Sequence, residues 1–295
     1  GVPYTPDKPV SGELSIYGST SMQPLAVLWM EEFRQMHPDS KAVIDCNGSE
    51  ESFQKLEVGK SIVGLVSREV SQDELDRWSL ETGAKLVAVS VGYDVLALIV
   101  HPENPLRILG WNAKLHSPLT LRDDQRGTNW GQFGVVEPLA DQPIHFQVLS
   151  KSHAIRAYAD QFLLQGGDGS EIVQEHETQS DVQAAVASDP KSLGLISAHR
   201  VATKKVRPLK LAISADQIIS PMDPLVIDRG YPLIRKLNLV LIAPKDSKED
   251  PLVNEFLAFV LSRQGQEVLC KDGFVPLDGS ELSLQLEKLG RIDLK

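Results

Sequence analysis

Three short turns place hydroxyl side chains where a helix is predicted to begin directly after a strand. They are Ser19-Thr20-Ser21, Gly48-Ser49 and Ser150-Lys151-Ser152-His153. The start of a helix presents unpaired N–H groups and a partial positive charge. Several such turns at one edge of a sheet can bind a small anion without a metal ion. The pattern therefore predicts an anion-binding site.

A simpler interpretation is that each hydroxyl only caps the helix that follows it. Ser and Thr are favoured N-cap residues, because their oxygens accept hydrogen bonds from the first N–H groups of a helix. Three turns of this kind favour a binding site more strongly than one turn alone. In the capping interpretation each hydroxyl accepts a hydrogen bond from its own helix, whereas in the binding-site interpretation it is available to a ligand.

Signatures of catalysis are scarce in the sequence. It contains no GxSxG, HExxH, GxGxxG or P-loop motif. Ser152 and His153 are a conceivable nucleophile and base of a hydrolase, but the sequence supplies no third partner for them. Glu175-His176-Glu177 lacks the spacing of one helix face, and we interpret it as solvated surface. We therefore expect neither catalysis nor a metal site.

Composition limits the classes of partner. The chain has 295 residues, 30 Lys and Arg against 40 Asp and Glu, and a net charge of -10. An acidic chain without a run of basic residues is a poor partner for nucleic acid or anionic lipid. No stretch approaches the roughly 18 consecutive apolar residues of a membrane-spanning helix. The composition does not exclude binding of a small ligand, because the net charge of a chain says little about its small-molecule sites.

The two cysteines leave two interpretations open. Cys46 and Cys270 have no CxxC or Cys/His spacing, which argues against zinc and redox motifs. They would form one disulfide in an exported protein, or they are two buried thiols. The polar start at Gly1 is typical of a processed secretory protein and also of an expression product.

An α/β framework must position the turns. Over about the first 90 residues, short apolar segments alternate with helical patterns, which predicts a parallel sheet covered by helices. The long stretch 87–100 is apolar except at Gly92-Tyr93-Asp94. Predicted strands are 13–17, 41–46, 62–66, 144–149, 193–197 and 236–243, and predicted helices include 23–37, 49–58, 152–164, 181–187 and one beginning at Asp250-Pro251.

A second α/β run lies between the long apolar stretches 87–100 and 236–243. This order predicts two lobes joined by two crossing strands. Lobe I is expected to comprise residues 12–95 and 234–295, and lobe II residues 96–233. Residues 1–11 would form an N-terminal arm.

Short motifs follow one another in a fixed order along the chain. They are Tyr17–Leu25 (YGSTSMQPL), Asn47–Ser49 with Ile62–Arg68 (IVGLVSR), Gly92–Leu106, Thr128–Trp130, Val186–Gly194, and Tyr231–Leu233 with Gly265-Gln266 and Gly273–Pro276. In this order they resemble the phosphate-binding-type extracytoplasmic solute receptors of ABC transporters, which have the type II periplasmic binding-protein fold. The resemblance covers nearly the whole chain.

The resemblance implies an α/β fold of two lobes, each a mixed, mainly parallel sheet flanked by helices. It implies a periplasmic or otherwise extracytoplasmic monomer, its signal peptide removed, that needs no cofactor. Such a protein captures phosphate or a similar oxyanion between its lobes for an ABC permease. The implied ligand contacts are Thr20, Ser21, Ser49, Ser67, Ser152, His153 and Arg156.

In the second lobe, the sequence departs from the family's glycine-rich ligand turn. Leu149 stands at the family's arginine position, and His153 and Ile155 stand where small or hydroxyl residues are expected. Lys151, Arg68 or Arg156 could restore positive charge, although each also suits a surface ion pair or a helix end. These changes motivate a second hypothesis, a sensory or protein-interaction module with an altered ligand pocket.

In the first lobe, Ser67 sits where some family members carry the aspartate that accepts the proton of hydrogen phosphate. Glu50-Glu51 replaces small residues after Ser49. A carboxylate a few Å from a bound anion would cost about 4 kcal/mol at an effective dielectric near 20. Either these carboxylates point to solvent or the ligand is not a simple anion.

Overall fold

The computed structural model describes residues 2–6, 9–112, 117–118, 129–164, 173–243 and 250–289, so that Thr128 of the expected TNW motif lies outside the described residues. The chain divides into two compact units. Unit 1 comprises Gly1–Asp94 and Arg235–Lys295, and unit 2 comprises Val95–Ile234. Strand β4 (Leu86–Val100) carries the chain out of unit 1, and β13 (Ile234–Ile242) carries it back.

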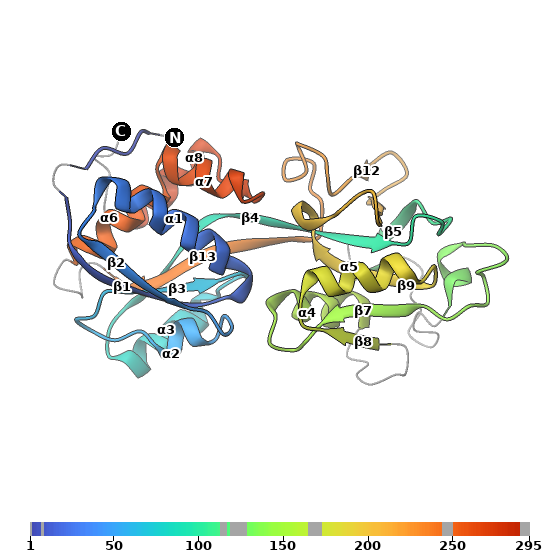
Figure 1. The fold of residues 1–295 in the computed structure, drawn as a ribbon, viewed down its shortest axis with the longest axis horizontal. Helices are drawn as coiled ribbons and strands as arrows, with labels where there is room; N and C mark the ends of the chain where they lie inside the picture. Colours follow the sequence, from blue (N-terminus) through green and yellow to red (C-terminus); the bar gives the residue numbers. More distant parts are fainter. Residues whose placement is uncertain are drawn as a thin grey trace. The chain divides into compact units, whose positions relative to one another are not determined.

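Unit 1 is built on a mixed sheet in the order β2-β1-β3-β13-β4, with β14 (Val275–Pro276) paired to β4 (Figure 1). Strand β1 (Gly12–Gly18) runs parallel to both β2 (Ser40–Asp45) and β3 (Ile62–Val66). Strand β13 runs antiparallel to β3. The α/β fold with a mixed sheet flanked by helices, expected from the sequence, is confirmed.

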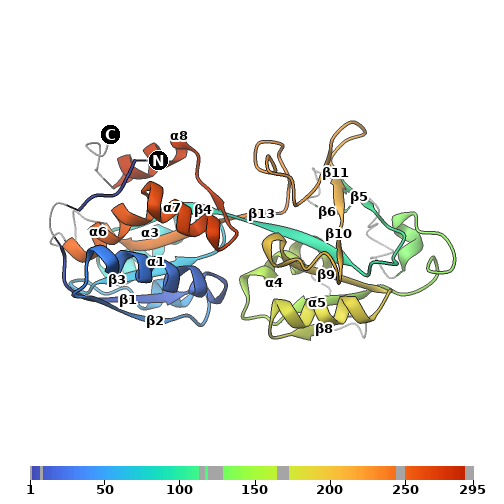
Figure 2. The ribbon, with the colours of Figure 1, turned by 45° about the horizontal axis from the view of Figure 1, so that its top comes forward.

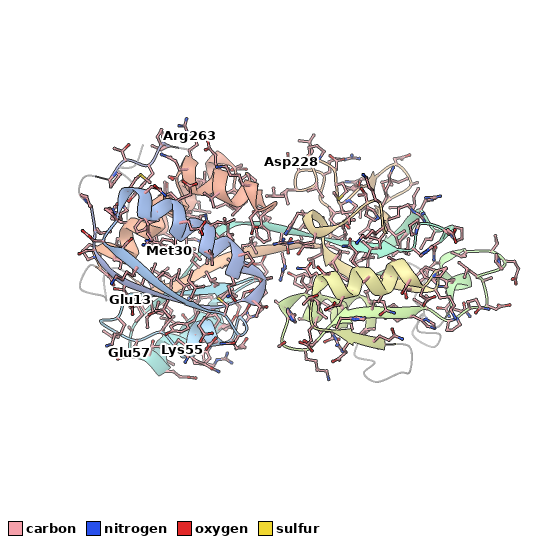
Figure 3. All side chains as sticks on the ribbon, viewed as in Figure 1. Glu13, Met30, Lys55, Glu57, Asp228 and Arg263 are labelled. Atoms are coloured by element: carbon pink, nitrogen blue, oxygen red, sulfur yellow. The ribbon has the colours of Figure 1, made fainter. Side chains whose placement is uncertain are left out.

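Helices cover both sides of this sheet. Figure 1 shows α1 (Gln23–Met36) and α6 (Pro251–Val260) on one side and α2 (Glu51–Gln54) and α3 (Gln72–Thr82) on the other. Met30, labelled in Figure 3, belongs to the buried face of α1. Two further helices, α7 (Arg263–Lys271) and α8 (Gly279–Lys288), complete the unit.

The helix predicted over 49–58 is wrong in length, since α2 spans only Glu51–Gln54. The chain turns after it, where the Lys60 N–H donates to the Glu57 carbonyl and Gly59 adopts a φ of 81°. Phe53 and Leu56 are nevertheless both buried in the core that α2 shares with α3 and β3. The apolar spacing was therefore a correct guide to burial and a poor guide to helix length.

Unit 2 contains the sheet order β4-β9-β7-β8, with β9 (Ser192–Ser197), β7 (His145–Leu149) and β8 (Val173–His176) mutually parallel where they pair. Figure 2 shows α5 (Gln179–Ser188) beside this sheet, and α5 contacts β9 and β7. In place of one helix over 152–164, α4 (Ala154–Ala159) is followed by a π-helical turn (Asp160–Leu164).

The shorter strands of unit 2 complete its framework. Strand β10 (Arg207–Pro208) pairs antiparallel with β4. A second, small sheet has the order β12-β11-β5-β6, formed by Ile218–Ile219, Lys210–Ala212, Ile108–Asn112 and Ser117–Pro118.

The N-terminal segment is anchored to unit 1 through a buried histidine. The Val10 N–H donates to His37 Nδ1 at 2.9 Å, and Tyr4 Oη lies 2.7 Å from His37 Nε2. Tyr4 Oη also donates to Glu255 at 2.6 Å. Because Nδ1 accepts a hydrogen bond, the ring is held in its neutral form. Burial lowers the pKa of His37 below its usual value, although Glu255 acts in the opposite direction.

The buried His37 predicts a stability change with pH. Because its folded-state pKa is lowered, the unfolded chain binds this proton first as the pH falls below about 6.5. The free energy of unfolding should therefore fall over that range, as measured by urea denaturation. In His37→Gln this part of the pH dependence should be absent. An equal decrease in both proteins would contradict the assignment.

Candidate functional site

Parallel pairing brings two of the predicted site turns together at one edge of the unit 1 sheet. Ser19 directly follows the end of β1, and Ser67 directly follows the end of β3. The carboxyl ends of parallel strands lie at the same edge, so their following residues meet. Ser19 Oγ and Ser67 Oγ are 2.7 Å apart. Strand β13 is antiparallel to β3, so its first residues, including Arg235, reach the same edge.

Three hydroxyls at this edge form what we call the serine cluster: Ser19, Ser21 and Ser67. Ser21 Oγ lies 2.9 Å from Ser19 Oγ and 3.3 Å from Ser67 Oγ. Arg235 donates to two of the three, from Nη1 to Ser67 Oγ at 3.0 Å and from Nη2 to Ser21 Oγ at 3.1 Å. The serine cluster is thus hydrogen-bonded to a cation.

Arg235 is held by a buried ion pair with Asp94. Its Nη2 and Nε lie 2.7 and 2.8 Å from Asp94 Oδ2, and both side chains have 0% exposure. Sequence reasoning missed both residues. Strand β4 runs unbroken from Leu86 to Val100, through Gly92-Tyr93-Asp94, and Asp94 is paired within it. A single charge inside a long apolar strand was the available signal, since a buried charge requires a partner.

The cluster has a buried layer and an accessible layer. Ser19, Ser67 and Arg235 are 2%, 0% and 1% exposed. Thr20 and Ser21 are half-buried and reach the surface. The hydroxyls accessible to a ligand are therefore those of Thr20 and Ser21, which lie outside the buried layer that contains the Arg235 guanidinium.

The second predicted turn lies beside this cluster. Ser49 is half-buried, and its Oγ accepts a long bond of 3.5 Å from the Ser67 N–H. The Gly48 N–H donates to the Gly18 carbonyl at 2.8 Å, which ties this turn to the end of β1. The structure therefore brings together Thr20, Ser21, Ser49 and Ser67, all predicted as site residues, within unit 1.

None of the three turns caps its helix through a hydroxyl. Ser19 precedes the 3₁₀ turn Thr20–Met22, Glu50 precedes α2 and His153 precedes α4, each without a side-chain capping bond. The simpler capping interpretation is therefore wrong for these turns. In the first turn, the serine hydroxyls bond one another and Arg235 instead.

Two glycines allow the close approach on which the first turn depends. Gly18 has a φ of 123°, and a Cβ there would lie 2.1 Å from Ser52 Oγ and 2.3 Å from the Leu65 carbonyl oxygen. Gly64 leaves similar room for Ser52, whose hydroxyl donates to the Leu65 carbonyl at 2.7 Å. The chain can therefore pack α2 directly beneath the strand ends that carry Ser19 and Ser67.

The two carboxylates that follow Ser49 are bound by partners within unit 1. Glu50 is exposed and pairs with Arg68 at 2.5 Å. Glu51 accepts hydrogen bonds from the Asn47 N–H and Nδ2, both at 3.2 Å, and lies 3.8 Å from Lys55 Nζ. These contacts reduce the repulsion that the sequence led us to expect for a bound anion.

Arg68 joins this network to α3. It donates to Glu74 at 2.7 and 2.8 Å and to Glu50. Its hydrogen bonds to Glu74, and secondarily to Glu50, raise the pKa of Arg68 despite its burial. Arg68 is therefore a permanent cation that neutralises acidic residues beside Ser49.

In unit 2, Arg156 supports the predicted ligand turn from within. It is 3% exposed, and it pairs with Asp160 at 2.6 Å and Glu175 at 2.5 Å. It also donates to the Leu149 carbonyl at 3.2 Å. Although burial alone lowers the pKa of Arg156, the bonds to Asp160 and Glu175 raise it. The expected solvated triplet 175–177 is thus partly structural, since Glu175 holds a buried arginine.

The other residues of this turn divide into exposed and buried positions. Ser152 is exposed, with its Oγ 3.3 Å from Ser150 Oγ, and His153 is half-buried at the start of α4. Leu149 and Ile155 are 1% and 2% exposed. The two apolar departures from the family pattern therefore face the core, and Ser152 and His153 remain at the surface of unit 2.

The structure records Cys46 and Cys270 as free thiols, the first buried and the second exposed, so the disulfide interpretation is wrong here. Burial, with Glu51 and Asp45 nearby, raises the pKa of Cys46 to about 12. Within the described ranges, no group of three or more His, Cys, Asp or Glu residues could hold a metal ion. None of the helices in those ranges has the length and apolar character that crossing a bilayer needs.

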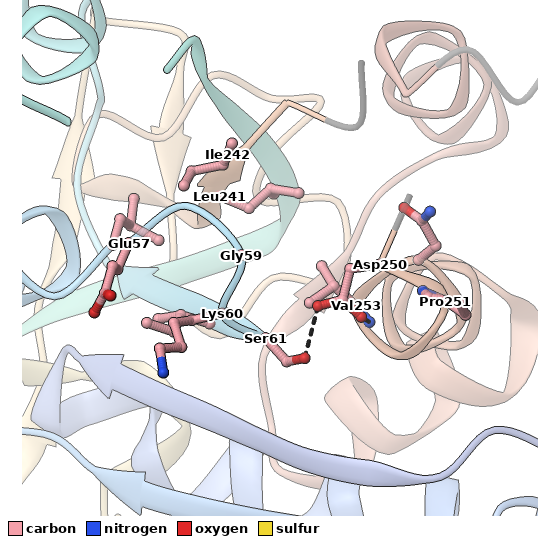
Figure 4. A pocket seen from close by; sticks show the side chains of 12 residues that line it. Glu57, Gly59, Lys60, Ser61, Leu241, Ile242, Asp250, Pro251 and Val253 are labelled. Atoms are coloured by element: carbon pink, nitrogen blue, oxygen red, sulfur yellow. Dashed lines mark hydrogen bonds between the residues drawn. The ribbon is translucent and has the colours of Figure 1, made fainter. Parts of the chain in front are cut away.

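A separate pocket of about 270 Å³ lies at the opposite end of β3 (Figure 4). Its polar lining includes Lys60, Ser61 and Asp250. Asp250 accepts from the Ser61 hydroxyl at 2.6 Å and from the first N–H groups of α6, so its carboxylate serves as a helix cap. This pocket contains none of the serine cluster.

Comparison with known proteins agrees with this architecture. A relative named phosphate-binding protein PstS, from Pseudomonas aeruginosa, is 28% identical over 285 residues, which cover 95% of this chain and 88% of the relative. The structure of an ABC-type phosphate transport receptor from Vibrio cholerae matches with a TM-score of 0.69 and 21% identity, covering 90% of this chain and 100% of that one. PstS from Borrelia burgdorferi matches with a TM-score of 0.58 and 19% identity, covering 91% and 100%.

The α/β units and their strand order define a protein with the architecture of the periplasmic binding proteins. A family model described as a PBP superfamily domain matches residues 4–264. The chain belongs to this superfamily, as the sequence motifs led us to expect.

The buried ion pair predicts an asymmetric response to mutation. Asp94→Asn leaves the Arg235 charge buried without a countercharge and should lower the free energy of unfolding by about 3 to 5 kcal/mol. The double variant Asp94→Leu/Arg235→Met removes both charges and should lose much less. The control, Asp223→Asn, breaks the exposed pair with Arg229 and should cost less than about 1 kcal/mol. A double variant as unstable as Asp94→Asn would contradict this account.

Gly18 predicts a second stability effect. Gly18→Ala should destabilise unit 1 by about 3 kcal/mol or more, because the new Cβ meets both an unfavourable φ and the Ser52 and Leu65 atoms. Gly59 also has a positive φ, but nothing lies within 4 Å of its Cβ position. Gly59→Ala should therefore cost only about 1 to 2 kcal/mol. Equal losses in urea denaturation would show that close packing at Gly18 is unimportant.

Proposed function

We propose that this chain is an extracytoplasmic, periplasmic solute-binding protein that delivers a small tetrahedral oxyanion to an ABC permease. Phosphate is the first candidate, because a relative and both structural neighbours are named for phosphate or as PstS. The single observation that carries the proposal is the serine cluster bonded from behind by Arg235. A rigid set of hydroxyls beside a buried cation stabilises an anion without a metal ion.

The proposed roles follow the two layers of the cluster. Thr20, Ser21 and Ser49 are accessible hydroxyls that would touch the anion directly. Ser67 would act from the buried layer by holding Ser21 and Arg235 in place. In unit 2, we assign ligand contact to Ser152 and His153. Arg156 would hold their turn through its bonds to Asp160, Glu175 and the Leu149 carbonyl.

The competing hypothesis of a sensory or protein-interaction module rested on the departures from the family pattern. Leu149 and Ile155 are buried, so they do not replace accessible ligand groups. Glu50 and Glu51 are bound by Arg68, Asn47 and Lys55. These positions therefore give no support for a degenerate site, and we favour solute binding without catalysis.

Calorimetric titration with inorganic phosphate tests the proposal. The wild-type protein should bind phosphate more tightly than about 1 mM. Ser21→Ala removes a hydroxyl bonded to a charged ligand and should weaken binding by about 10-fold or more. Ser283→Ala, at an exposed position on α8, is the matched control and should bind as the wild type does. Absence of phosphate binding in the wild type would refute the proposal for phosphate.

A further inference from the structure

We infer that His37 is an acid-sensitive attachment point of the N-terminal segment, and that its protonation releases the segment at Val10 while the attachment at Tyr4 is kept. This device does not depend on the proposed function, because the segment precedes β1 whereas the serine cluster follows the other end of that strand.

The N-terminal segment is attached to unit 1 at two places. At the first, the Tyr4 N–H donates to Gln264 Oε1 at 2.8 Å, and Gln264 Nε2 donates to the Tyr4 carbonyl at 3.0 Å. The Tyr4 ring also packs edge-on against Phe259, with centroids 5.6 Å apart. At the second, the Val10 N–H donates to His37 Nδ1 at 2.9 Å. The backbone of the first place is thus held by an amide that does not titrate, and that of the second by an imidazole.

The hydrogen bonds around His37 have a fixed direction. A neutral imidazole has one donor and one acceptor nitrogen. Because Nδ1 accepts from the Val10 N–H, the single ring proton lies on Nε2. Nε2 therefore donates to Tyr4 Oη, 2.7 Å away, and Tyr4 Oη donates to Glu255 at 2.6 Å. One polar chain runs from the Val10 N–H through the ring and the Tyr4 hydroxyl to a carboxylate.

Protonation changes the two sides of this ring differently. Both nitrogens of an imidazolium are donors, so Nδ1 can no longer accept from Val10, and two N–H groups would face each other. Nε2 keeps its proton and its bond to Tyr4 Oη, and Glu255 beyond it favours the positive charge. The Val10 side therefore opens, whereas the Tyr4 side is retained.

The groups that face His37 come from three elements and from the N-terminal segment. Phe33 of α1 packs against the ring with centroids 4.2 Å apart, and Ser40 of β2 donates to the His37 carbonyl at 2.6 Å. Helix α6 contributes the carboxylate of Glu255, and the N-terminal segment contributes the Tyr4 hydroxyl. Of the described residues around the ring, Glu255 is thus the charged one and Tyr4 the other titratable one.

These surroundings couple the proton to opening of the segment. His37 has 0% exposure, and burial lowers its pKa more strongly than Glu255 raises it. Opening at Val10 gives the ring access to water and returns its pKa toward about 6.5. The open form therefore binds the proton more tightly than the attached form, so that a falling pH favours opening.

Hydrogen exchange of single amides in the full chain, measured by NMR and corrected for the intrinsic exchange rate, tests the inference. Between about pH 7 and pH 5 the protection of the Val10 amide should fall by about fivefold or more, because each pH unit below the open-state pKa favours opening by up to about tenfold. The protection of the Tyr4 amide should change by less than about twofold. Unchanged protection at Val10, or an equal loss at Val10 and Tyr4, would overturn the inference.

Two variants separate the titration of His37 from other effects of acid. His37→Asn places an amide oxygen near the Nδ1 position, where it can accept from Val10 but does not titrate. The Val10 protection of this variant should change by less than about twofold over the same pH range. The control, His101→Gln, removes another imidazole whose Nδ1 accepts a backbone N–H, that of Glu103 at 3.1 Å, and should keep the wild-type response at Val10.

Circular dichroism establishes that each variant is folded, and His37→Gln replaces His37→Asn if the latter does not fold. Loss of the pH response in the folded His37 variant, together with its retention in His101→Gln, is the expected result. A full response of the Val10 amide in the folded His37 variant would overturn the inference.

Discussion

Arg235 and Asp94 are both withdrawn from water within unit 1, and two buried opposite charges are tolerable only while they stay paired and hydrogen-bonded. This constraint explains the surroundings of the pair. The remaining donors of Arg235 need acceptors, and the hydroxyls of Ser67 and Ser21 supply them. The serine cluster is thus the means by which the sheet accommodates a buried charge, as well as a surface that offers hydroxyls to a ligand.

The topology of unit 1 makes this arrangement possible. Parallel pairing of β1 with β3 brings Ser19 and Ser67 to one edge, and the antiparallel insertion of β13 brings Arg235 to the same edge. Gly18 and Gly64 permit the close packing of Ser52 beneath the strand ends. Hydrogen bonds then run from the guanidinium outward, so that a cation without surface exposure still sets the polarity of hydroxyls at the surface.

Much of this could be predicted from the sequence, and the parts that could not share a physical cause. Alternating apolar segments and hydroxyl turns correctly predicted the α/β sheet and the meeting of Ser21, Ser49 and Ser67, because these depend on local pattern and on parallel pairing. Asp94 and Arg235 were missed because they lie 141 positions apart. Their contact depends on which strand lies between β3 and β4, and no local pattern records that. The roles of Glu50 and Arg156 were similarly hidden, since each depends on its ion-pair partners.

The central claim is that Arg235 organises the serine hydroxyls for anion binding and is not needed merely to fold the chain. Phosphate calorimetry on the Asp94→Leu/Arg235→Met variant, with folding established by circular dichroism, tests this claim most directly. The account predicts a folded protein whose phosphate affinity falls by about 100-fold or more, because the hydroxyls lose both their orientation and the nearby positive charge. A folded variant that binds phosphate as tightly as the wild type would contradict it.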